Sequence, residues 1–137
     1  DGADELDIVM NISAFKSGMP WVKIGLAKCA NLAHEHGAAL KAIIETAYLD
    51  QEEIKTACRL VADAGADFIK TSTGFAHSGA QLTHVKLMRS QSPSNVGVKA
   101  SGGIKDYANP KQMIAAGADR LGVSSGLAIM EEFKKAN

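Results

Sequence analysis

The sequence of 137 residues has no net charge, no long apolar run and only two cysteines. Its 15 basic and 15 acidic residues cancel, so no general electrostatic attraction to nucleic acid or to an anionic membrane is expected. No apolar stretch approaches the roughly 20 residues of a transmembrane helix, and the first residues lack the pattern of a signal peptide. We therefore expect a soluble cytoplasmic protein without nucleic-acid or membrane partners, in which any anion site is local.

Cysteine and histidine are too few and too scattered to indicate a disulfide framework or a metal site. Cys29 and Cys58 both fall in helical patterns and are expected to be reduced core thiols, since a disulfide framework needs more cysteines. No C-x-x-C spacing occurs, and the four histidines do not form a ligand set by spacing. We expect no metal and no other cofactor.

Short apolar runs alternate with amphipathic stretches along the whole chain. The pattern predicts strands over 5–12, 39–46, 66–73, 95–103 and 119–126, and helices over 21–37, 50–65, 80–91, 109–117 and 127–136. Asp50 is a plausible N-cap, Gly37 and Gly65 close two helices, and Pro110 lies in a first turn. Five βα units imply one α/β domain, over residues 1–137, with a parallel sheet. An open doubly wound sheet and part of a (β/α)8 barrel both fit, because a complete barrel takes about 250 residues.

Charged residues inside the predicted strands are the informative ones. Asp7, Lys41, Lys70 and Lys99 each lie within an apolar run, and alternate residues of a strand share one face. Parallel sheets are normally covered on both faces, so a solvent-exposed face does not explain these charges. A barrel lumen explains them better, because its inward positions near the carboxyl ends of the strands form the active site.

Two lysines on neighbouring strands, Lys70 and Lys99, disfavour each other's charge, and burial adds to that penalty. Lowering the pKa of a lysine from about 10.4 to about 7 takes roughly 4.7 kcal/mol, which desolvation and one like charge together can supply. The neutral amine that results attacks carbonyls to form Schiff bases. Asp7 would then pair with the second lysine and shuttle protons through a water. A buried Lys–Asp ion pair without chemistry fits the spacing equally well.

Small residues follow the last two predicted strands. The segments "SGGIK" at 101–105 and "GVSSG" at 122–126 each place free backbone N–H groups before a helix, which makes an anion cradle. Loops after the last strands of a barrel commonly hold phosphate, and "STGF" at 72–75 would add a third loop. Tight βα turns without a ligand remain an alternative, in which Ser124 and Ser125 cap the final helix.

Together the segments "ELDIVMNI", "KAIIET", "ADFIKTSTGF", "GVKASGGI" and "ADRLGVSSG" resemble deoxyribose-phosphate aldolase in the same order and at similar spacing. The resemblance covers 2–136. It implies a (β/α)8 barrel and a metal-free class I aldolase that cleaves 2-deoxy-D-ribose 5-phosphate to D-glyceraldehyde 3-phosphate and acetaldehyde. The combination of "IKTSTG" with "GVKASGG" is specific and disfavours an unrelated half-barrel enzyme with similar phosphate loops.

By motif, Lys70 matches the Schiff-base lysine and Asp7 the proton-relay aspartate of that family. Lys99 matches the second lysine, whose charge favours the neutral form of the first. The resemblance assigns phosphate binding to seven residues: Gly74, Gly102, Gly103, Lys105, Gly122, Ser124 and Ser125. It also implies a supporting lumen pair, Lys41 with Glu45, and a supporting Thr71.

Three departures from the family pattern concern completeness and the substrate site. The chain begins at Asp1, at the family's fourth strand, so the first three βα units are absent. Phe75 stands where some members have a lysine, although others carry Phe, and the C-terminal "EEFKKAN" lacks the tyrosine of some members. Open sheet edges and an open lumen lead us to expect a truncated or split aldolase, completed by an N-terminal chain or by self-association into a homo-oligomer. The alternative is a truncated, non-catalytic sugar-phosphate-binding or assembly module of the same fold.

Overall fold

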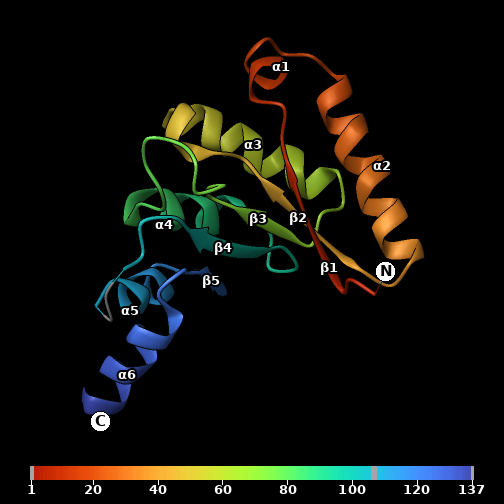
Figure 1. The fold of residues 1–137 in the computed structure, drawn as a ribbon. Helices are drawn as coiled ribbons and strands as arrows, with labels where there is room; N and C mark the ends of the chain where they lie inside the picture. Colours follow the sequence, from red (N-terminus) through yellow and green to blue (C-terminus); the bar gives the residue numbers. More distant parts are fainter. Residues whose placement is uncertain (1, 106–107, 137) are drawn as a thin grey trace.

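Five parallel strands in sequence order form one sheet, and the βα connections place the helices along its outer side (Figure 1). The computed structural model describes residues 2–105 and 108–136. The strands are β1 (Glu5–Val9), β2 (Ala39–Ile43), β3 (Phe68–Lys70), β4 (Gly97–Ser101) and β5 (Arg120–Gly122). The helices are α1 (Ile12–Lys16), α2 (Trp21–Glu35), α3 (Gln51–Asp63), α4 (Leu82–Gln91), α5 (Ala108–Ala115) and α6 (Gly126–Ala136). The five predicted βα units are thus confirmed, in the predicted order.

Local signals account for where several elements begin and end. Asp50 caps α3 in a capping box, since its side chain accepts from the Glu53 amide and the Glu53 side chain accepts from the Asp50 amide. Gly65 follows α3 with φ of 81°, as the predicted helix end requires. The strand predicted to reach residue 12 ends at Val9 instead, because Asn11 accepts a bond from the Ala14 amide and caps the short helix α1. That helix was missing from the prediction.

Alternate strand residues face opposite sides of the sheet, and the outer side forms the core. Leu40, Ala42, Ile69, Val98 and Ala100 are all buried on that side. They belong to one cluster with helix residues that include Leu26, Ile54, Val61, Val85 and Met88. Each fully buried aliphatic side chain of this size contributes about 1.5–3 kcal/mol, so the outer face holds the strands in place. The inner face is therefore free to carry polar groups.

Two aspartates hold the amino ends of the central strands in register. Asp67 precedes β3, and its Oδ2 accepts from the Leu40 amide and from His34 Nε2, each at 2.8 Å. Asp119 precedes β5 in the same "AGAD" context, and its Oδ2 accepts from the Val98 amide at 2.8 Å and from Arg89 at 3.1 Å. Both carboxylates thus join a neighbouring strand to a helix. This anchoring fixes which inner-face residues stand side by side further along the strands.

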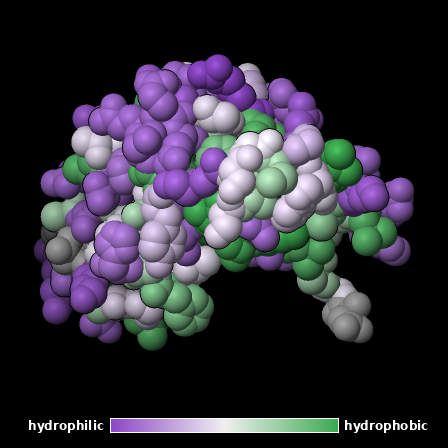
Figure 2. Space-filling view, turned by 90° about the horizontal axis from the view of Figure 1, so that it is seen from above, coloured by the Kyte–Doolittle hydropathy of each residue, from purple (hydrophilic) through white to green (hydrophobic). Residues whose placement is uncertain are grey.

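The sheet is curved, and its inner side is open. Figure 2 shows the molecule from above as an arch with a hollowed side, along part of which hydrophobic residues gather. The curvature brings the two outermost strands within reach of each other, since Arg120 of β5 donates to the carboxylate of Glu5 on β1. Among the described residues, no helix is long and apolar enough to cross a membrane.

Candidate active site

Charged side chains from all five strands, including Arg120 of β5, meet on the inner face of the sheet. The strand register places Asp7 beside Lys41, and Lys70 beside Lys99, in two successive rows. The side chains of Lys41, Lys70 and Lys99 are 5%, 12% and 19% exposed, so all three are largely covered by their neighbours. The expectation that the inner face collects these charges is confirmed.

Asp7 lies at the centre of this cluster. Lys41 Nζ is 3.1 Å from its Oδ1, and Lys70 Nζ is 2.7 Å from its Oδ2. Lys99 Nζ lies 3.9 Å from the same Oδ2, beyond hydrogen-bond distance. One carboxylate therefore holds two ammonium groups and stands close to a third, which places a proton acceptor between the two lysines that the sequence singled out.

The neighbouring charges shift the pKa values of the cluster in opposite directions. Burial opposes ionisation of Asp7, but hydrogen bonds from Lys70 and Lys41 outweigh it and hold the pKa of Asp7 below its usual value. Burial likewise opposes the charge on Lys41, yet its bonds to Glu5 and Asp7 raise the pKa of Lys41. The pKa of Lys99 is lowered, because burial and the charges of Lys70 and Lys41 outweigh the attraction of Asp7. Lys99 is thus the member of the cluster whose ammonium form the surroundings disfavour.

Two residues that the sequence reasoning did not assign to the site, Glu5 and Arg120, complete the network. Glu5 Oε2 is 2.9 Å from Lys41 Nζ, and Arg120 donates to both Glu5 oxygens. Hydrogen bonds from Arg120 and Lys41 lower the pKa of Glu5 to about 2. Strand alternation puts Glu5 on the same face as Asp7, and this was the one sequence signal that pointed to Glu5. The approach of Arg120 to Glu5 depends on the curvature of the sheet.

Arg120 is positioned by an aromatic ring that needs a glycine beneath it. Its guanidinium carbon lies 4.5 Å from the centre of the Phe68 ring, within cation–π range. The ring in turn covers Gly97, where a Cβ atom would come within 2.3 Å of a ring carbon. The glycine therefore creates the space for Phe68, and Phe68 supports Arg120.

The expected pairing of Lys41 with Glu45 is wrong. β2 ends at Ile43, and Glu45 has a left-handed backbone with φ of 51°, so Glu45 does not continue the strand that carries Lys41. The buried Glu45 carboxylate instead accepts from the amide and the hydroxyl of Thr73. It thereby anchors the loop that follows β3, while Lys41 is held by Glu5 and Asp7.

Thr71 is fully buried and joins β3 to β4 behind the inner face. Its hydroxyl donates to the Ser101 carbonyl at 3.1 Å and accepts from the Ser101 amide at 3.0 Å. Ser101 Oγ donates to the Ser72 carbonyl at 2.6 Å. These bonds fix the carboxyl ends of the strands that carry Lys70 and Lys99.

A cavity of about 460 Å³ opens at the carboxyl ends of β3, β4 and β5. Its lining comprises Lys70 and six of the seven residues expected to bind phosphate, which are Gly74, Gly102, Gly103, Lys105, Gly122 and Ser124. Gly102 and Gly103 have φ of 83° and 75°, in the left-handed region that favours glycine. The seventh residue, Ser125, is not part of the lining and precedes α6, where its carbonyl accepts from the Ile129 amide. The cavity therefore joins Lys70 to the glycine-containing loops that follow β3, β4 and β5.

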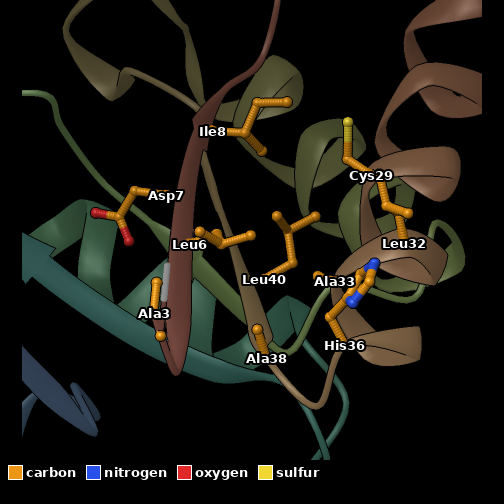
Figure 3. Close-up of a pocket in the computed structure, with 11 residues that line it drawn as sticks. Ala3, Leu6, Asp7, Ile8, Cys29, Leu32, Ala33, His36, Ala38 and Leu40 are labelled. Atoms are coloured by element: carbon orange, nitrogen blue, oxygen red, sulfur yellow. The ribbon is translucent and has the colours of Figure 1, made fainter.

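A second, larger cavity of about 670 Å³ lies between β1 and α2 on the outer side of the sheet (Figure 3). Its lining is mainly apolar and includes Leu6, Cys29, Leu32 and Leu40. Figure 3 shows the Asp7 carboxylate pointing away from this group, toward the inner side of β1. The chemistry-bearing groups therefore belong to the inner face.

Within the described residues, no group of three or more His, Cys, Asp and Glu could hold a metal ion.

The family model for DeoC/LacD family aldolases matches residues 1–132. A deoxyribose-phosphate aldolase from Thermococcus kodakarensis is 52% identical over 132 residues, which is 96% of this chain and 59% of that protein. A protein of the same name from Aquifex aeolicus is 51% identical over 136 residues, 98% of this chain and 61% of that protein. The chain spans about three fifths of the length of the curated relatives it matches.

Solved structures give the same result for the fold. The structure titled "QR15, an Aldolase" superposes with a TM-score of 0.90 at 51% identity, covering 98% of this chain and 60% of that one. A deoxyribose phosphate aldolase from Aeropyrum pernix, described as having a unique tetrameric structure, superposes with a TM-score of 0.88 at 34% identity. It matches 99% of this chain and 57% of its own. The likeness agrees with the fold expected from the sequence, a parallel α/β sheet that forms part of a barrel.

Proposed function

This chain belongs to the DeoC/LacD family of aldolases, and we propose that it carries the active site of a class I aldolase acting on 2-deoxy-D-ribose 5-phosphate. The products would be D-glyceraldehyde 3-phosphate and acetaldehyde, and the covalent intermediate a Schiff base on Lys70. One observation above all supports this function. Lys70 lines the same cavity as the glycine loops and donates to the Asp7 carboxylate at 2.7 Å. An amine, a proton acceptor and an anion cradle thus occur together.

In the proposed reaction, the amine of Lys70 attacks the carbonyl carbon of the open-chain sugar. The carbon–nitrogen bond forms, the carbonyl oxygen leaves as water, and the Schiff base draws electrons from the carbon–carbon bond that breaks. The hydroxyl proton of the departing aldehyde passes to Asp7, directly or through a water. The enamine left on Lys70 then takes up a proton at carbon, and water hydrolyses the resulting Schiff base to acetaldehyde and the free amine. Lys99 Nζ, 3.9 Å from Asp7 Oδ2, would exchange protons with that carboxylate through a bridging water, and its lowered pKa suits this role.

The substrate phosphate would lie at the opposite end of the cavity, on the loops that follow β4 and β5. Backbone amides of Gly102 and Gly103 and the hydroxyl of Ser124 are suited to a phosphate dianion, and Lys105 adds a positive charge. Holding the phosphate there fixes the distance between the sugar carbonyl and Lys70. Positioning of this kind accounts for a large part of the rate of such reactions.

The test is reduction with borohydride in the presence of acetaldehyde, followed by peptide mass spectrometry. A reduced adduct on Lys70 is expected, and Lys70→Ala should abolish it. Lys86→Ala is the matched control, because Lys86 is an exposed lysine on α4, away from the cavity, and should leave the adduct unchanged. An unmodified Lys70 in the presence of adducts on surface lysines would refute the assignment.

The second candidate, a non-catalytic sugar-phosphate-binding module, is favoured only by the cavity at the glycine loops. It predicts that inorganic phosphate protects these loops from hydrogen exchange while no adduct forms on Lys70. We also propose that the protein is cytoplasmic and self-associates, since one structural relative is described as tetrameric. Light scattering coupled to size-exclusion chromatography tests the association, and a monomer at all concentrations would contradict it.

A further inference from the structure

An ion pair joins the first strand of the sheet to the last, directly beside the lysine cluster. Arg120 of β5 stacks on the Phe68 ring and donates to both oxygens of Glu5 on β1. The stacked, planar guanidinium has little freedom, because Phe68 fills the space above Gly97. Glu5 is thus held in one place, and it is the residue that shares Lys41 with Asp7.

We propose that Glu5 and Arg120 are a positioning pair that sets the charge balance around Lys70, acting through Lys41 and Asp7. Lys41 Nζ is divided between Glu5 Oε2 at 2.9 Å and Asp7 Oδ1 at 3.1 Å. Because Lys41 occupies Oδ1, Asp7 turns Oδ2 toward Lys70, at 2.7 Å. A stronger bond between Glu5 and Lys41 therefore weakens the bond between Lys41 and Asp7, and the Asp7 carboxylate then interacts more strongly with Lys70. This inference rests on the proposed Schiff-base role of Lys70.

The two members of the pair act on Lys70 with opposite sign. The charged groups around Lys70 are Glu5 and Asp7 from β1, Lys41 from β2, Lys99 from β4, Arg120 from β5 and Lys105 in the same cavity. Without the Glu5 charge, Lys41 depends on Asp7 alone and draws it away from Lys70, so the ammonium form of Lys70 loses support. Without the Arg120 charge, Glu5 holds Lys41 more tightly and leaves Asp7 to Lys70, so that ammonium form gains support.

The experiment follows the titration of Lys70 by NMR of the chain with 13Cε-labelled lysines, assigned by comparison with Lys70→Ala. Glu5→Gln should move the midpoint of the Lys70 titration to lower pH, and Arg120→Met should move it to higher pH. Each shift should be about 0.5 pH unit, since a partly exposed charge that acts through a neighbour is screened. The double variant should return the midpoint toward that of the unsubstituted chain. Arg120→Lys keeps the positive charge but loses the planar guanidinium, and it should cause a smaller shift than Arg120→Met.

A matched control comes from the exposed pair between Lys23 of α2 and Asp63 of α3, 2.8 Å apart on the helical side of the molecule. Asp63→Asn should leave the Lys70 midpoint unchanged. Shifts of the same sign in Glu5→Gln and Arg120→Met, or no shift in either, would overturn the inference, because a merely structural role gives no opposition of sign. Borohydride trapping tests the aldolase function separately. NMR shifts of opposite sign without an adduct on Lys70 would support the charge-setting pair and refute the proposed chemistry.

Discussion

Replacing Gly97 with alanine tests whether the support beneath Arg120 depends on a missing side chain. The added Cβ would lie 2.3 Å from a ring carbon of Phe68, whereas unstrained carbon atoms approach to about 3.5 Å. Overpacking of this kind costs about 1–3 kcal/mol. Gly97 lies in β4 and does not have a positive φ, so alanine also recovers about 0.5–1 kcal/mol of backbone entropy. Because the overlap exceeds 1 Å, the cost belongs to the upper part of that range, about 2–3 kcal/mol, and the expected net loss of stability is about 1–2.5 kcal/mol.

Thermal and urea unfolding, followed by circular dichroism, measure this loss. For a chain of 137 residues we expect Gly97→Ala to lower the Tm by roughly 3–8 °C. Gly25→Ala is the matched control, because Gly25 lies within α2 with nothing within 4 Å of its added Cβ, and it should raise stability by about 0.5–1 kcal/mol. Combining Gly97→Ala with Phe68→Leu should recover part of the loss. A Gly97→Ala chain as stable as the unsubstituted one would refute the reasoning that Phe68 fills this space.

Three further predictions concern the lysine cluster and the strand anchors. Lys99→Leu removes a cation beside Asp7 and Lys70, so adduct formation on Lys70 with acetaldehyde and borohydride should need a higher pH. An unchanged pH profile of adduct formation would show that Lys99 does not favour the neutral amine of Lys70. Thr71→Val leaves the buried Ser101 amide unpaired, whereas the Ser101 carbonyl still accepts from the Ala80 amide. The variant should destabilise the fold by about 1–3 kcal/mol in urea unfolding, and a loss below about 0.5 kcal/mol would contradict the anchoring. Burial opposes the charge on Asp67, but hydrogen bonds from His34 and from the Leu40 amide outweigh burial and lower the pKa of Asp67 in the folded chain. The carboxylate therefore stabilises the fold above about pH 4, and this stabilisation is lost as the pH falls below that value. His34→Gln should reduce this acid-dependent loss of Tm, and an identical pH dependence in both chains would show that the pair does not matter.

The sequence was sufficient to predict that Asp7, Lys70 and Lys99 lie together. Strand alternation assigns each to a face, and parallel strands of one sheet bring their carboxyl ends to a common edge. The seven residues expected to bind phosphate came from the family resemblance instead, and six of them line the glycine-loop cavity.

Features that depend on curvature or on single backbone angles were not predictable in the same way. Arg120 reaches Glu5 only because the sheet bends β5 toward β1, which no local pattern encodes. Glu45 leaves the strand alternation through one left-handed residue, and glutamate has no strong preference for that conformation. The two-residue alternation of a strand does not extend past such a residue, and Glu45 bonds to Thr73 rather than to Lys41.

The balance of charge on the inner face favours an anionic ligand over an empty site. Among the residues that the structure describes, Lys41, Lys70, Lys99 and Arg120 face two carboxylates, Glu5 and Asp7, so this cluster has an excess of cations in a partly buried environment. Such an excess disfavours the ligand-free fold, because like charges repel and burial weakens their hydration. Either an amine of the cluster gives up its proton or an anion binds close by. A phosphorylated substrate that reacts with a lysine meets both conditions. Its phosphate brings negative charge into the cavity, and its carbonyl carbon reacts with the neutral amine.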